Sequence, residues 1–219
     1  MLDVIISIIV AIISIFISVS TIRYPLLKKE KHPKVFLPQN IKHYLFAFGM
    51  IASIAIVMVS SLLLYEHSWI ECSKRVILIS FLWAISLFDF RKHIIPNKIL
   101  LILLAIRVVI VVFQFIFISN IKTELLDCFI AGLGIIIILC VMRFVVKEGI
   151  GFGDVKLFGV IGLFLGIEGI LTVVFLSFVA SFLISIFMLV TKRKNKKDYL
   201  AFAPSILIGT IVSFVLFGA

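Results

Sequence analysis

Two aspartates in this sequence stand at the edges of long apolar runs, where a carboxylate could take part in catalysis. Asp89 follows "AISLF", and Asp154 lies in "EGIGFGDVKLFG", residues 148–159. An acid at a hydrocarbon boundary is costly unless it is hydrated or paired. Two carboxylates about 4 Å apart repel by about 4 kcal/mol at an effective dielectric of 20, so one of them keeps a proton. Such a pair can hydrolyse a peptide bond, because the carboxylate takes a proton from water while the acid donates a hydrogen bond to the scissile carbonyl.

The residues around the two acids suit a site that is open to an extended substrate. Gly151 and Gly153 allow backbone conformations closed to other residues, and they place no side chain in front of Asp154. Pro96 ends one helical segment and can begin the next. Lys156 could pair with the two acids or with a substrate carboxylate, and an anchor at the membrane surface fits it equally well.

The elements that hold these residues are predicted to be membrane helices. Apolar residues make up 63% of the 219 residues, well above the roughly 45–50% of soluble domains. The apolar segments show no alternation of the kind that membrane strands need. We therefore predict an all-α, polytopic integral membrane protein with residues 1–219 as a single membrane-embedded domain. The eight predicted segments, the first of them uncleaved, are Leu2–Ser20, Tyr44–Leu64, Val76–Phe88, Ile99–Ile118, Leu125–Val146, Val155–Leu165, Ile170–Val190 and Tyr199–Phe217.

The basic residues predict how these segments are oriented. Sixteen of the 21 Lys and Arg residues fall in the connections 21–43, 89–98, 147–156 and 191–198, and only three fall in the connections between them. Since cytoplasmic connections carry the excess of Lys and Arg, these four connections should lie in the cytoplasm and both termini on the outer side of the cell membrane. Asp89 and Asp154 then share the cytoplasmic face. Orientation also explains most of the net charge of +10, with attraction to membrane lipid and without nucleic acid.

Cysteine usage and the remaining polar residues add no second site. Cys72, Cys128 and Cys140 form no C-x-x-C pair, so we predict no metal and no cofactor. Arg107, deep in the fourth segment, is expected to form a structural ion pair whose partner the sequence does not name. Arg143 is expected to reach the cytoplasmic surface, and His93 to be a solvated loop residue.

Taken together, the motifs resemble those of the type IV prepilin peptidases, a family of G-x-G-D membrane aspartic peptidases. "GFGDVKLFG" matches the G-x-G-D-x-K-L signature, and "FDFRKHIIPNKI" matches the first aspartate site with its I-P-[DN] element, which ends in Pro96 and Asn97. "AFAPSIL" resembles the proline motif that opens the last span, with Pro204 at the proline. The resemblance covers roughly residues 76–217.

The resemblance implies a membrane endopeptidase that cleaves the basic cytoplasmic leader of prepilins or pseudopilins. It makes Asp89 and Asp154 the catalytic pair and makes Gly151 and Gly153 shape the site. Many members carry a four-cysteine zinc module between their first two spans and also methylate the new N-terminus. The cytoplasmic connection 21–43 has no cysteine, so this chain resembles a reduced form and is expected to leave a free amine.

A different function class stays open on the residues alone. Paired membrane acids also mark proton or cation pathways, so a small transporter or ion pathway that uses the two aspartates is the alternative. Transporters place such acids near mid-membrane in broken helices, whereas these two are predicted at a surface. The sequence names neither the particular pilin nor the oligomeric state.

Overall fold

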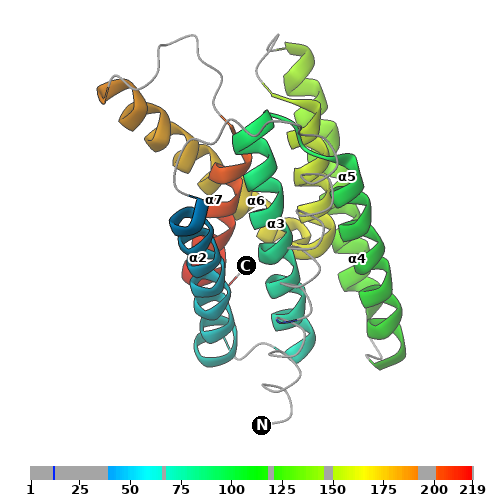
Figure 1. The fold of residues 1–219 in the computed structure, drawn as a ribbon. Helices are drawn as coiled ribbons and strands as arrows, with labels where there is room; N and C mark the ends of the chain where they lie inside the picture. Colours follow the sequence, from blue (N-terminus) through cyan, green and yellow to red (C-terminus); the bar gives the residue numbers. More distant parts are fainter. Residues whose placement is uncertain are drawn as a thin grey trace. The chain divides into compact units, whose positions relative to one another are not determined.

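A computed structural model shows the described part of the chain to be helical throughout. It describes residue 12 and the ranges 39–65, 68–117, 121–145, 150–191 and 201–218, and these contain no strand. The helices are α2 (Gln39–Val59), the π-helical turn η1 (Ser60–Leu64), α3 (Trp69–Lys92), α4 (Asn97–Phe117), α5 (Ile121–Val145), α6 (Phe152–Val190) and α7 (Ala203–Leu216). Figure 1 shows these elements along the chain. The all-α prediction is confirmed.

Three of the described helices are long and apolar enough to cross a membrane: α4 over Asn97–Ile116, α5 and α6. The apolar stretches Phe48–Leu64 and Ala203–Leu216 are shorter. The helices support the membrane class, and the number of eight spans stays a prediction. Apart from Ile12, the segment Leu2–Ser20 lies outside the described residues, as does most of the connection 21–43.

The chain divides into two compact units, residues 1–84 and 85–219. In the first unit the Trp83 indole N–H donates to Ser53 Oγ at 2.7 Å. Helix α3 begins at Trp69, earlier than the predicted start at Val76, so Lys74 and Arg75 lie inside the helix and are buried. The predicted boundary was wrong because both cations have partners there: Lys74 pairs with Glu71 at 2.5 Å, and Arg75 donates to Ser61 Oγ at 3.1 Å.

In the second unit, glycines let α6 pack closely on both of its neighbours. A Cβ added at Gly162 would lie 3.0 Å from the Gly132 backbone of α5, and one added at Gly209 of α7 would lie 2.6 Å from Ser177 N of α6. Small residues at membrane-helix interfaces permit such approach of backbones. The first part of α6 is thereby fixed to α5, and its second part is fixed to α7.

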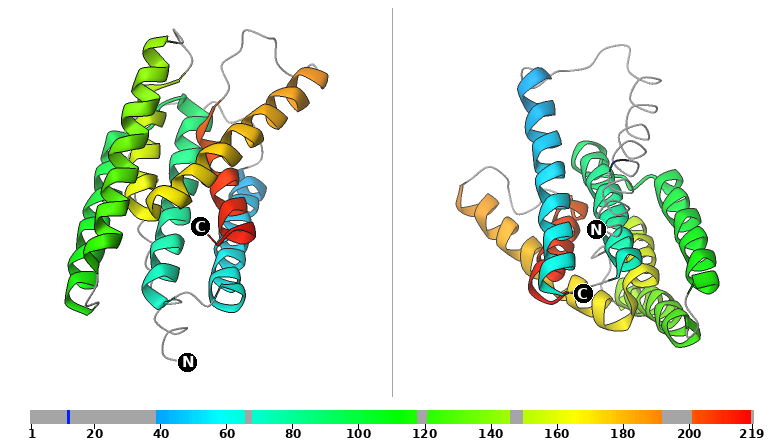
Figure 2. Two further views of the ribbon diagram at one scale, coloured as in Figure 1. Left: turned by 180° about the vertical axis from the view of Figure 1, so that it is seen from behind. Right: turned by 90° about the horizontal axis from the view of Figure 1, so that it is seen from below.

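Helix α6 bends where the sequence predicted a turn between two segments. The predicted segments Val155–Leu165 and Ile170–Val190 form one helix that is interrupted at Gly166, which has φ 75° and ψ −173°. Figure 2 shows α6 turning sharply in its yellow part before its orange part continues. This left-handed conformation favours glycine because it lacks a Cβ.

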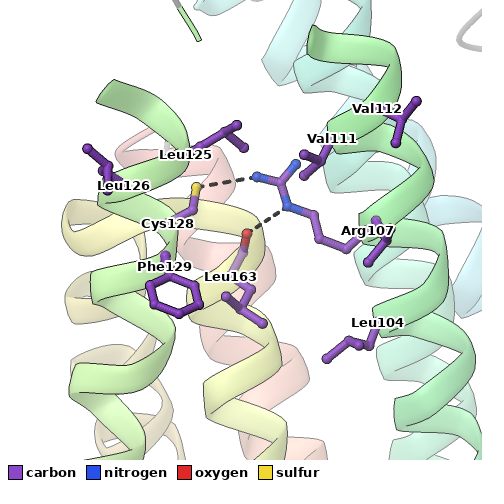
Figure 3. Close-up of a pocket in the computed structure, with 10 residues that line it drawn as sticks. Leu104, Arg107, Val111, Val112, Leu125, Leu126, Cys128, Phe129 and Leu163 are labelled. Carbon is purple, nitrogen blue, oxygen red and sulfur yellow. Dashed lines mark hydrogen bonds between the residues drawn. The ribbon is translucent and has the colours of Figure 1, made fainter. Parts of the chain in front are cut away.

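Arg107 lies in the interior of the second unit, beside this bend. Its guanidinium donates to Leu163 O at 2.7 Å and to Cys128 Sγ at 3.4 Å (Figure 3). It also donates to Gln114 Oε1 at 2.9 Å. All three partners are neutral, so the expected direct ion pair is replaced by hydrogen bonds. An arginine can satisfy several acceptors at once because its N–H groups form a planar fork.

Candidate active site

Asp89 lies in the last turn of α3 and is 7% exposed. Its Oδ2 accepts a hydrogen bond from the Ala203 backbone N–H at 2.9 Å. Ala203 is the first residue of α7, where N–H groups have no partner within the helix. Pro204, which matched the family's proline, follows at the helix start, where its missing N–H costs nothing. The start of α7 therefore fixes one oxygen of Asp89.

Asp154 lies in the first turn of α6 and is half-buried. The Asp89 carboxylate is close enough to interact electrostatically with Asp154, so the fold brings together the two predicted acids from α3 and α6. Helix N-termini favour negative charge by about 0.3–1 kcal/mol in exposed positions. Asp154 is the third residue of α6, and Ala203, whose N–H binds Asp89, is the first residue of α7, so each acid lies at a helix N-terminus.

The sequence analysis gave two reasons for a glycine at residue 151, a special backbone conformation and space for Asp154, and the structure supports only the second. Its φ of −69° and ψ of 143° are open to any residue, so the prediction that it needs a glycine-only conformation was wrong. The space argument holds, because a Cβ at this position would lie 2.9 Å from Asp154 Oδ2. Gly151 is thus the residue that lets the carboxylate lie against the backbone.

The loop after α3 packs against the start of α6. A Cβ added at Gly153 would lie 3.0 Å from Ile95 Cβ, so this glycine too provides room; it lies inside α6 and does not have a positive φ. Lys156 Nζ donates to Asn97 Oδ1 at 3.3 Å, which links α6 to the first residue of α4. Pro96 immediately precedes α4 and is half-buried. These contacts bring the I-P-N and G-x-G-D motifs together.

Two further contacts near the site were not predicted. Arg143 of α5 stacks over the Phe152 ring at 4.0 Å and donates to the Ile150 carbonyl, so it holds the segment before Asp154 instead of only reaching the surface. No motif or spacing indicates this contact, because Arg143 and Phe152 belong to different helices. His93 is exposed as expected, with a φ of 51° that ends α3.

Comparison with known proteins assigns the fold and its two motifs to a family. The sequence matches the type IV leader peptidase family over residues 76–189, a range that contains both aspartates and the whole of α4 and α5. The chain belongs to the type IV leader peptidase family. The suspected family is therefore confirmed, and so is the membrane class of the protein.

This type IV leader peptidase family member is also similar to a Bacillus protein. It is 30% identical over 150 residues to the "Prepilin leader peptidase/N-methyltransferase" of Bacillus subtilis (strain 168). The match covers 67% of this chain and 56% of the relative, so the chain spans little more than half of that protein's length. No solved structure matches the chain.

Proposed function

We propose that the protein is an aspartic endopeptidase that cleaves the leader of type IV prepilins or pseudopilins. The observation that carries the proposal is that Asp89, in the last turn of α3, lies close enough to Asp154, in the first turn of α6, for the two carboxyl groups to interact electrostatically. Family membership and the name of the Bacillus relative support the same reaction. No part of the proposal requires a metal or a cofactor.

The two carboxyl groups divide the work of hydrolysis. One, as carboxylate, takes a proton from a bound water, and the water oxygen attacks the scissile carbonyl carbon. The other, as carboxylic acid, donates a hydrogen bond to the carbonyl oxygen as it becomes tetrahedral. The C–N bond then breaks, and the leaving amine takes the proton that the first carboxylate had removed from water, which restores that carboxylate. The Ala203 N–H holds Asp89 through its Oδ2 atom.

The surroundings of the pair favour a membrane-bound substrate approached from the cytoplasm. Arg91 and Lys92 are exposed beside Asp89, as the positive-inside rule expects of a cytoplasmic end. Phe90 and Phe152 are 69% and 55% exposed close in sequence to the two acids. This apolar surface suits the hydrophobic segment that follows a prepilin leader. These features support a site at the cytoplasmic face of the cell membrane.

Purified protein and a prepilin, reconstituted together in lipid, test the proposal. Mass spectrometry should show cleavage between leader and mature segment, undiminished by a chelator, with a free amine on the product. An N-methylated product from this protein alone would contradict the reduced-form interpretation. Proton or cation flux in liposomes without any cleavage would contradict the peptidase and favour the transporter.

A further inference from the structure

The bend in α6 separates the two parts of the proposed active site. Residues before Gly166 carry Asp154, and residues after it pack on α7, whose first N–H binds Asp89. The Phe202 ring, just before α7, contacts both parts: its centroid lies 6.0 Å from that of Phe158 and 5.5 Å from that of Phe178. The angle of the bend therefore decides where the start of α7 lies relative to Asp154.

Two charged side chains replace a backbone hydrogen bond at the bend. In a continuous helix the Ile167 N–H would donate to Leu163 O, four residues earlier. Here the Ile167 N–H donates to Asp127 Oδ2 of α5 at 3.1 Å. The Leu163 carbonyl accepts instead from Arg107 Nε of α4 at 2.7 Å (Figure 3). Both groups of the broken bond are thus satisfied, as buried or partly buried backbone groups require.

The burial of Arg107 indicates that this arrangement is not incidental. The side chain is 4% exposed, and a buried charge is costly unless its hydrogen bonds are satisfied. Besides Leu163 O it is held by Gln114, which in turn donates to Glu124 Oε1 at 2.9 Å, and it lies 5.7 Å from the Phe164 ring centroid. None of these groups belongs to the proposed active site.

We propose that Arg107 and Asp127 are positioning residues, which hold α6 bent at Gly166 and thereby align Asp154 with the segment of α7 that binds Asp89. The claim about catalysis rests on the proposed function, whereas the claim about the bend does not. Losing either side chain leaves a backbone group unpaired, which favours re-forming the helical bond and straightening α6.

Two engineered cysteine pairs report the bend without reference to activity. Phe158→Cys with Phe202→Cys joins the first part of α6 to the start of α7, and Phe178→Cys with Phe202→Cys joins the second part to the same point. Both pairs are placed in a chain whose native cysteines are changed to serine, which keeps an acceptor for Arg107 at residue 128. The rate of linkage by a short bifunctional thiol reagent is followed by mass spectrometry.

Each positioning residue has a matched pair of variants. Asp127→Leu removes the acceptor, whereas Asp127→Asn keeps one for the Ile167 N–H. Arg107→Gln removes the charge and most donors, whereas Arg107→Lys keeps the charge but not the planar fork. The severe variants should slow linkage of the 158–202 pair about tenfold and lower kcat about 10- to 100-fold with little change in KM. The 178–202 pair should link at the wild-type rate. Asp127→Asn should preserve both readouts, and Arg107→Lys should fall between.

The outcomes separate this proposal from the peptidase assignment. Unchanged 158–202 linkage in folded Asp127→Leu and Arg107→Gln would overturn the role in bending. Slower linkage with an unchanged kcat would overturn the role in positioning. If the wild-type protein cleaves no prepilin but the severe variants still link the 158–202 pair more slowly, the role in bending stands and only the proposed function is refuted.

Discussion

A single methyl group at residue 151 should slow catalysis without unfolding the protein. The Cβ of Gly151→Ala would lie 2.9 Å from Asp154 Oδ2, whereas ordinary contacts begin at 3.4 Å. The carboxylate must therefore move by about 0.5 Å, which is the tolerance within which catalytic groups must be held. Since a 1 Å misplacement can cost about 100-fold, we expect kcat to fall about tenfold, or about 1.4 kcal/mol of activation free energy.

The fold should tolerate this change, because the backbone at Gly151 has φ −69° and ψ 143° and the residue is exposed. Gly134→Ala on α5 is the matched control, since nothing lies within 4 Å of the Cβ it would add. Both variants are assayed as purified protein on one prepilin substrate, with thermal unfolding in detergent measured in parallel. If Gly151→Ala cleaves at the wild-type rate, the inferred contact between residue 151 and Asp154 is wrong.

Three further predictions follow from packing, pairing and topology. Gly209→Ala should destabilise the protein by about 1–3 kcal/mol, because the new Cβ would lie 2.6 Å from the Ser177 backbone N; an unchanged thermal midpoint would contradict the close α6–α7 packing. Lys156→Gln should change kcat/KM by less than about fivefold, since its described bond is an exposed one to Asn97; a loss of a hundredfold would mean that Lys156 serves the catalytic pair. Reporter fusions after Lys34, Arg91, Lys147 and Lys196 should all report cytoplasm, and an external signal after Lys147 would place Asp89 and Asp154 on opposite faces.

The class of fold could be predicted from composition, and motif spacing indicated two acids that the fold places close enough to interact, because both signals depend on side chains alone. The interruption of α6 was also placed well, since "LGIEG", residues 165–169, breaks an apolar run with two glycines and an acid. The start of α3 was not predicted correctly. Cations such as Arg75 are typical of a loop between membrane segments, and the sequence does not show the partners that allow them to be buried in a helix.

The finer structure of the site could not be predicted because much of it consists of backbone groups. The N–H of Ala203 binds Asp89, and the carbonyl of Leu163 binds Arg107. Both are backbone groups, so the residue types at these positions do not indicate the contacts. The Leu163 carbonyl becomes available to Arg107 because α6 bends, so this partner of Arg107 could not be named from the sequence. For Gly151 the sequence predicted both room for Asp154 and a conformation closed to other residues, and the structure supports only the first. A glycine in a sequence does not show which of these two properties its position needs.

The catalytic pair itself is tested most directly by removing each titratable group while keeping its shape. Asn at residue 89 can still accept the Ala203 N–H, so Asp89→Asn and Asp154→Asn should fold in the membrane. Each should lower the rate of prepilin cleavage by at least about a thousandfold, the scale of general acid–base catalysis. The double variant should be no slower than either single one, because groups that act as a unit are not additive. Glu168→Gln, an exposed acid on the same helix as Asp154, is the control and should keep its activity. A well-expressed Asp154→Asn protein that cleaves prepilin at near the wild-type rate would contradict the aspartic mechanism.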